Sequence, residues 1–327
     1  MLRRRLASVL DRLGLIEHVL AHARWLPVLA YHRIRRGLDR FDQGVVDATP
    51  EALDWQLTEL SRHFEVISCD QLLDGDVPPH AAMVTFDDGY RECITEALPV
   101  LERHGIPATF FVVTGDIAER RVFWWDRIAY ALHETALEHI RMSYPKPLEL
   151  DLTEGRERGI RTLLSVVKAT PALDFSRFLR ELYQRGEVPW TPQDERHWAD
   201  VLVMSWDDVR ALRDAGMQIG SHTRTHRILQ NVPAEELADE LRGSRDDLRR
   251  ELSADVRVVS YPVGRPISGS PSVVAAVRDA GYTLGFSTGV HWLPKTTHSL
   301  DLARICLDPD ITAPELRALL AHPAFAG

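Results

Sequence analysis

The chain reads AMVTFDDGYRECITEALPVLERHGIPATFFVV over residues 82–113, and this stretch decides the fold. Apolar runs at Ala82–Phe86 and Ala108–Val113 predict two strands. Between them, Glu92–His104 has the pattern of a helix, which Gly105 ends. A strand, a helix and a second strand in this order are typical of a parallel sheet, because the connection is too long for a hairpin. The sequence therefore predicts an α/β protein.

The same alternation continues on both sides of this stretch. Further strands are expected at Leu26–Tyr31, Met217–Gly220, Val256–Ser260 and Thr283–Ser287. Further helices are expected at about residues 50–63, 205–216, 234–252, 271–280 and 313–321, the first capped by Thr49 and the second by Ser205. The alternating part is short for eight strand–helix units. We therefore expect a reduced or distorted (β/α) barrel.

The alternation lapses between about residues 116 and 200. Helical patterns dominate there, at Trp124–His133, Arg156–Lys168 and Phe175–Arg185. We interpret this segment as a mainly helical insertion that interrupts one barrel domain of residues 26–327. The total of 327 residues suits either two domains or one large domain with an insertion.

Residues 1–25 predict an N-terminal amphipathic helix, with leucines and Val9 at helical spacing after the basic run Arg3–Arg5. The helix either packs on the domain or touches anionic lipid. Charged residues interrupt what would be the apolar core of a signal peptide. A cytoplasmic location, either free or peripheral to the inner membrane, is therefore expected.

Composition narrows the class of protein. The 39 Lys and Arg residues against 48 Asp and Glu residues leave a net charge of −9, which argues against a nucleic-acid binder. The cysteines Cys69, Cys93 and Cys306 are far apart, which fits a reducing compartment. No apolar run is long enough to span a membrane. Nothing in the sequence indicates the oligomeric state.

Two adjacent carboxylates, Asp87 and Asp88, follow the strand at Ala82–Phe86, and Gly89 allows a sharp turn after them. Neighbouring residues of an extended chain point to opposite sides, so one carboxylate can bind a cation while the other serves as a base. Alternatively the pair only forms a turn, since Asp and Gly are turn formers.

Two histidines, His222 and His226, follow a later strand. If Ser221 caps a helical turn, both imidazoles lie on one face and can share a metal ion. Two imidazoles and a carboxylate form a typical catalytic zinc set, which leaves a position open for water. The alternative is a pair of surface histidines. Because both motifs follow strands of one barrel, together they predict a metal site.

The sequences TFDDG at 85–89 and SHTRTH at 221–226 together resemble the first two signature motifs of the polysaccharide deacetylases, carbohydrate esterase family 4. The resemblance spans about residues 28–305, apart from the insertion. It implies a distorted (β/α) barrel and an enzyme that hydrolyses the linear amide C–N bond of an N-acyl amino sugar. The expected substrate is a polysaccharide or a lipid-linked glycan precursor.

By position, the resemblance implies that Asp88, His222 and His226 bind the metal and that Asp87 is the general base. Zinc is the expected ion, although Co²⁺ or Ni²⁺ can occupy the same ligand set.

The sequence SYPVG at 260–264 resembles the third family motif, in which the residue before the glycine donates its backbone N–H to the oxyanion. Val263 holds that place instead of an aromatic residue, and its N–H is expected to contribute about 3 kcal/mol. Ser260 replaces an arginine that many members carry, so Arg304 or Arg265 is the candidate to orient Asp87. A plain proline turn is the alternative.

The general acid is expected to be His32, which ends VLAYH at 28–32. This stretch resembles the exopolysaccharide-deacetylase branch, where the motif with the acid histidine lies at the front of the chain. His298 and His291 are the reserve candidates, and a purely structural His32 is the alternative.

The insertion contains Phe123-Trp124-Trp125-Asp126, whose aromatic rings either form a wall for a sugar or anchor the packing of the insertion. Two other functions remain open: a hydrolase of a small amide or imide on the same barrel, and an inactive glycan-binding module.

Overall fold

The computed structural model describes residues 2–23, 25–37, 39–288, 299–322 and 325. Within them, parallel strands form a closed barrel in the order β1-β12-β11-β10-β9-β6-β5, and β1 pairs with β5 to complete the circle. The strands are β1 (Val28–Tyr31), β5 (Ala81–Phe86), β6 (Thr109–Val112), β9 (Gln218–Ser221), β10 (Val258–Ser260), β11 (Leu284–Thr288) and β12 (Leu302–Cys306). The short strand β4 (Glu65–Val66) pairs in parallel with the beginning of β5. The predicted distorted (β/α) barrel is confirmed.

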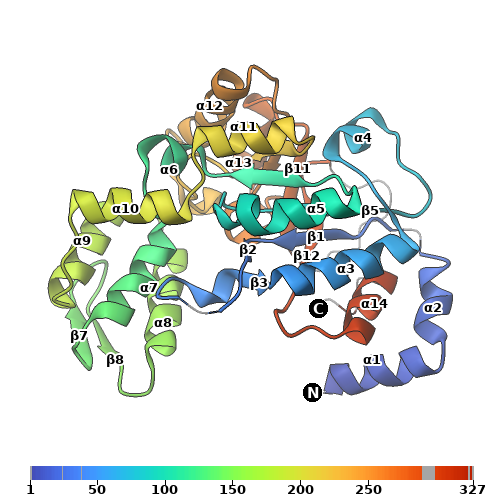
Figure 1. Ribbon diagram of the computed structural model, residues 1–327. Helices are drawn as coiled ribbons and strands as arrows, with labels where there is room; N and C mark the ends of the chain where they lie inside the picture. Colours follow the sequence, from blue (N-terminus) through green and yellow to red (C-terminus); the bar gives the residue numbers. More distant parts are fainter. Residues whose placement is uncertain (1, 24, 38, 289–298, 323–324, 326–327) are drawn as a thin grey trace.

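Helices surround the barrel, with α11 and α12 on one side and α3 and α14 on the other (Figure 1). They are α3 (Pro50–His63), α4 (Cys69–Asp74), α5 (Leu98–His104), α6 (Thr114–Glu119), α11 (Trp206–Asp214), α12 (Ser244–Leu252), α13 (Pro271–Asp279) and α14 (Ala313–Ala321). The predicted caps form: Thr49 Oγ1 accepts the Ala52 N–H at 3.1 Å, and Ser205 forms a reciprocal capping box with Asp208.

Strand β12 lies between β11 and β1, where no strand was predicted. Its sequence, LARIC, has an arginine in the middle, and Arg304 is only 2% exposed. A buried charge inside a short strand conceals the apolar pattern by which such strands are recognised.

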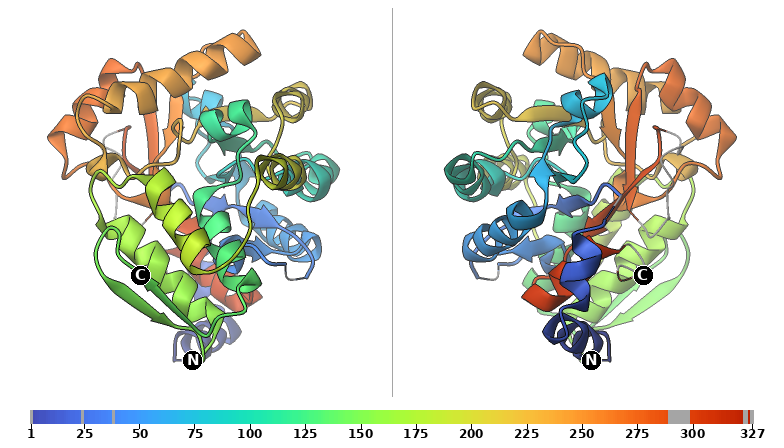
Figure 2. Two further views of the ribbon diagram at one scale, coloured as in Figure 1. Left: turned by 90° about the vertical axis from the view of Figure 1, so that its left-hand side faces the viewer. Right: turned by 90° about the vertical axis from the view of Figure 1, so that its right-hand side faces the viewer.

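The insertion lies beside the barrel as a separate group of elements (Figures 1 and 2). It comprises α7 (Trp124–Glu134), α8 (Arg156–Ala169), α9 (Phe175–Arg185), α10 (Pro192–Leu202) and the antiparallel hairpin β7 (His139–Met142) and β8 (Leu148–Asp151). The three predicted helices are present, whereas α10 and the hairpin were not predicted. A short parallel pair, β2 (Arg33–Ile34) and β3 (Val46–Ala48), follows β1.

The N-terminal segment forms two helices, α1 (Leu2–Arg12) and α2 (Leu15–Leu20), rather than the single expected helix. They are separated at Gly14, whose φ of 69° is left-handed and is readily adopted only by glycine. Both pack against α14. Within the described residues, no helix has the length and apolar character needed to cross a membrane.

Candidate metal centre

The carboxyl ends of the barrel strands bring the polar motifs together. The β1–β5 register pairs Tyr31 with Phe86, and the Asp87 N–H donates to the Tyr31 carbonyl at 2.8 Å. His32 and Asp87 are thus the next residues on neighbouring strands, which in a sheet lie about 4.8 Å apart. His222 directly follows β9, which is adjacent to β10 in the same barrel. This is the end of a (β/α) barrel at which active sites lie.

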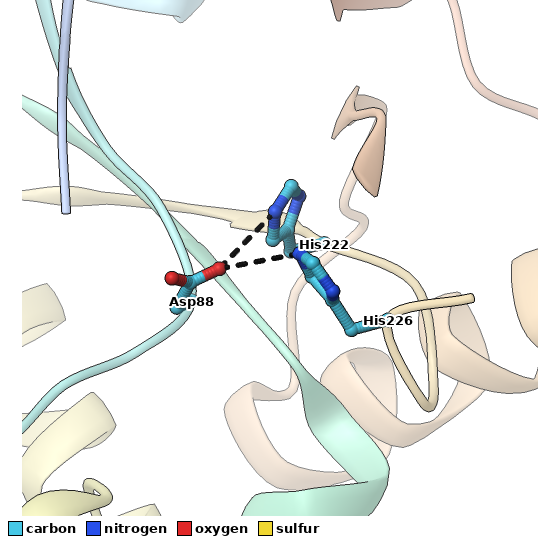
Figure 3. Close-up of side chains that lie close together, drawn as sticks. All are labelled: Asp88, His222 and His226. Atoms are coloured by element: carbon cyan, nitrogen blue, oxygen red, sulfur yellow. Dashed lines mark ion pairs between the residues drawn. The ribbon is translucent and has the colours of Figure 1, made fainter. Parts of the chain in front are cut away.

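Asp88, His222 and His226 converge in the interior (Figure 3). The Nε2 atoms of both histidines lie 3.4 Å from Asp88 Oδ1, and the two ring centroids are 4.7 Å apart. All three side chains are buried. Asp88 Oδ1 accepts no hydrogen bond from any described residue. A buried carboxylate oxygen without a donor suits a cation, so the three residues fit a divalent metal ion.

Each histidine is held in place by neighbouring groups. The Nδ1 atom of His222 lies 2.9 Å from the Ser260 carbonyl, which accepts its N–H and leaves Nε2 directed at Asp88. The ring centroids of His226 and Trp125 lie 4.3 Å apart. Trp124 Nε1 donates to the His226 carbonyl at 3.4 Å. Burial, followed by the nearby His222, lowers the pKa of His226 to about 3. His226 is therefore neutral, the form that binds metals.

The segment that carries the two histidines is a loop, so the helical turn expected after Ser221 is wrong. Thr223 and His226 have φ values of 64° and 53°, which no right-handed helix contains. Glu240 stabilises the loop instead, because its Oε2 accepts the backbone N–H groups of Arg224 and Thr225 at 3.1 and 3.0 Å. The imidazoles converge through this loop geometry and not through helical spacing.

Asp87 binds Arg304, and its Oδ2 atom also lies 3.8 Å from Nε2 of His222. Two parallel bonds join Asp87 and Arg304, Nη1 to Oδ1 at 2.7 Å and Nη2 to Oδ2 at 2.6 Å. Ser260 Oγ accepts from Arg304 Nη2 at 2.7 Å and donates to Asp87 Oδ2 at 3.2 Å. Burial alone would raise the pKa of Asp87, but the Arg304 guanidinium and then His222 hold it well below its usual range. Of the two arginine candidates, the structure places Arg304 on Asp87.

His32 has an acidic partner that was not predicted. Its Nδ1 lies 3.1 Å from Asp47 Oδ2, which also accepts the backbone N–H of His32. Burial would lower the pKa of His32, but the charge of Asp47, together with those of Asp88 and Asp87, raises it well above the usual value. Asp47 comes from β3 and stands alone in its sequence context, so no motif identified it. The reserve candidates His291 and His298 lie outside the described residues.

Val263 lies in the turn after β10 and has φ 54° and ψ 16°. This left-handed conformation is rare for a β-branched residue and marks local backbone strain. Such outliers gather at functional sites, and this one is three residues from the Ser260 carbonyl that holds His222. Its role as an oxyanion donor stays a prediction.

The aromatic residues at the start of α7 are packing residues. Phe123, Trp124 and Trp125 are all at least nine-tenths buried, and Trp125 Nε1 donates to Tyr90 Oη at 2.7 Å. Beside them, a groove of about 700 Å³ separates the insertion from the loop around His226. Its lining includes Trp124, Phe175, Tyr183, Trp190, Arg180 and Arg227.

Comparisons with known proteins agree with the fold. In the solved structures, the deacetylase PplD of Streptococcus pyogenes is 18% identical, with a TM-score of 0.56 over 90% of this chain and 96% of that chain. IcaB from Ammonifex degensii is also 18% identical, with a TM-score of 0.56 over 91% and 98%. A polysaccharide deacetylase from Bacillus cereus is 17% identical, with a TM-score of 0.56 over 90% and 68%. At these identities the likeness establishes the fold.

A search of curated proteins found no match. The family profile described as polysaccharide deacetylase matches residues 74–160 and 177–285, which is more than half of the chain. The matched ranges contain the Asp87-Asp88 pair, both loop histidines and the SYPVG turn. The chain therefore belongs to the polysaccharide deacetylase family.

Proposed function

We propose that this protein is a metal-dependent hydrolase that removes an N-acyl group, expected to be acetyl, from an amino sugar of a glycan. The observation that carries the proposal is the convergence of Asp88, His222 and His226 on one buried point. A carboxylate fixed by Arg304 and a histidine fixed by Asp47 follow strands at the same end of the barrel. Amide hydrolysis needs such a base and such an acid.

Asp88, His222 and His226 would hold the metal. Zn²⁺ suits one carboxylate and two imidazoles, and Co²⁺ or Ni²⁺ suits the same set. A divalent ion bound there lowers the pKa of water towards about 7 and polarises the amide carbonyl.

The protein's own groups would move the protons. Asp87 takes a proton from the attacking water, while Arg304 holds both carboxylate oxygens in a fixed orientation. The Val263 backbone N–H donates to the developing oxyanion, a contribution of about 3 kcal/mol in comparable sites. When the C–N bond breaks, His32 gives its proton to the leaving amine, with Asp47 stabilising the charged imidazole.

The substrate would be a polysaccharide or a lipid-linked glycan precursor. The groove between the insertion and the His226 loop supports a chain longer than one sugar, because aromatic and arginine side chains line it. We propose a cytoplasmic location, either free or at the inner face of a membrane.

The test measures bound metal and acetate release from acetylated chitooligosaccharides. Asp88→Asn and His222→Gln should each lose the ion and the activity, because each removes a ligand. His139→Gln is the matched control, since its side chain is 57% exposed on β7. A folded wild-type protein that binds no ion after zinc is added would contradict the proposal and favour an inactive glycan-binding module. Bound zinc with hydrolysis of small amides or imides only would favour the other alternative.

A further inference from the structure

The N-terminal helices carry an unusual share of the exposed apolar side chains. Among the residues whose side chains are described, seven large apolar residues stand out as exposed, and five of them belong to this short segment. They are Leu6, Val9, Leu13, Leu15 and Val19, with Leu13 as much as 66% exposed. We call these five residues the N-terminal stripe. Single exposed apolar residues are ordinary, but a cluster of them marks an interaction surface.

The stripe occupies one face of α1. Leu6 and Val9 belong to α1, and Leu13 directly follows it with its N–H bonded to the Val9 carbonyl at 3.1 Å. Because the three residues are three and four positions apart, they project from the same side. The opposite side is fixed to α14, because Arg317 Nε donates to Asp11 Oδ1 at 2.8 Å and Ala7 is buried. The orientation of α1 is therefore set by its inner face, and the stripe is turned to solvent.

Helix α2 continues the stripe after Gly14. Leu15 and Val19 are four residues apart and exposed, whereas Ile16 and Leu20 are buried on the inner side. Figure 1 shows α1 and α2 at the outer edge of the molecule next to α14, on the side away from α11 and α12. Figure 2 shows α1 at the same outer edge from two other directions.

Positive charge lies next to the stripe. Arg5 and Arg12 are seven residues apart and exposed, so they share a side of α1 that adjoins Val9. Neither has an ion-pair partner among the described residues, whereas Asp11 is paired with Arg317. This local excess of positive charge contrasts with the net charge of −9 of the whole chain.

We propose that the N-terminal stripe, with Arg5 and Arg12, is a docking surface for an anionic lipid bilayer. The apolar side chains would enter the boundary between headgroups and acyl chains, and the arginines would contact lipid phosphates. A second copy of the chain fits less well, because five partly exposed side chains fall short of the roughly 800 Å² per partner of a standard interface. The surface uses none of the metal-centre residues, so it goes beyond the proposed function.

The experiment is co-sedimentation of the full chain with vesicles. One set contains phosphatidylcholine and phosphatidylglycerol, and the other contains phosphatidylcholine alone. The wild type should bind the anionic vesicles, and the binding should weaken as salt is added. The double variant Val9→Glu with Val19→Glu should lower the partition coefficient at least about tenfold, since it places carboxylates in the stripe. Arg5→Gln with Arg12→Gln should remove most of the preference for anionic lipid.

Val77→Glu with Val201→Glu is the matched control, because these valines are exposed by 42% and 47%, against 53% for Val9 and 41% for Val19. The control should bind vesicles like the wild type, and all variants should keep their metal and their activity on a soluble substrate. Equal binding of stripe and control variants would overturn the proposal. The proposal would also be overturned if the wild type bound neither kind of vesicle but formed a dimer that the stripe variant does not form.

Discussion

Two buried carboxylates, one at the centre of the barrel and one in the insertion, show opposite responses to the same burial. Asp87 directly follows β5 and Asp126 lies on α7, and both side chains are buried. Burial raises the pKa of Asp126 to about 7, and the charge of Arg33 offsets this only in part. In Asp87 the effect of burial is overcome, mainly by Arg304, and the pKa falls.

The difference lies in the nature of the donors. Asp87 is bound directly by a guanidinium through two bonds. Among the described residues, the hydrogen-bond donors to Asp126 are two neutral groups, the Tyr90 hydroxyl at 2.7 Å and the Asp42 N–H at 2.9 Å. Neutral donors satisfy an oxygen but do not balance a charge. Asp87 at the barrel centre thus stays ionised, as a base requires. Asp126 in the insertion instead serves as a buried hydrogen-bond acceptor.

The largest effect is expected from Arg304→Met, which breaks the barrel half of this comparison. Asp87 would remain as a buried charge without its guanidinium partner, at a cost of about 3–5 kcal/mol in the free energy of unfolding. Activity should fall steeply as well, because the base loses its orientation. Urea unfolding and acetate release measure the two effects. As a control, Arg141→Met removes an exposed ion pair to Glu149 and should change stability by less than about 1 kcal/mol. Equal losses in the two variants would contradict this account.

A smaller effect is expected from Asp47→Asn. This variant removes the charged partner of a buried histidine, His32, as Arg304→Met removes that of a buried carboxylate. Asp47 raises the pKa of His32, so His32 keeps its proton to higher pH. Without that charge the pKa should fall, and the loss of activity at high pH should begin at a lower pH. We expect a decrease of about 10²-fold in kcat near neutral pH, with metal content unchanged. A pH profile of kcat tests the shift, and an unmoved alkaline limb would exclude His32 as the acid.

The smallest effect is expected from Asp126→Asn, which tests the insertion half. Because folding raises the pKa of Asp126, the folded state holds this proton more tightly than the unfolded state does. The resulting stability is complete below the ordinary pKa of about 4 and is lost as pH rises through about 7. The Asn variant lacks this loss, so the melting temperature of the wild type relative to the variant should decline between about pH 4 and pH 7. A constant difference would mean that Asp126 is ionised throughout.

The sequence predicted most of the barrel and the residues that meet at its end, because apolar strands followed by polar residues are a local pattern. The strand β12 was missed because Arg304, buried by its bonds to Asp87, interrupts its apolar run. Asp47 was missed because its partnership with His32 depends on the β2–β3 pairing, which two-residue and three-residue strands do not reveal.

The His222–His226 spacing was recognised, but its conformation was misjudged. A spacing of four residues suggests a helical turn, whereas the backbone N–H groups of the loop bind Glu240 instead. The Glu240 carboxylate is fifteen and sixteen positions away from these N–H groups in the chain, and a local sequence pattern does not reveal such a contact. The two N-terminal helices were predicted as one because Gly14 alone signals the break.

The position of β12 has a consequence for how the protein is made. It follows every other barrel strand in the sequence, yet it lies between β11 and β1, the first strand. During synthesis the barrel therefore stays open until this strand leaves the ribosome, with two unpaired edges available to chaperones or to misassembly. Arg304 arrives on the same strand, so Asp87 acquires its counter-charge only at closure. A nascent chain would thus gain a competent base at the moment when its barrel becomes complete.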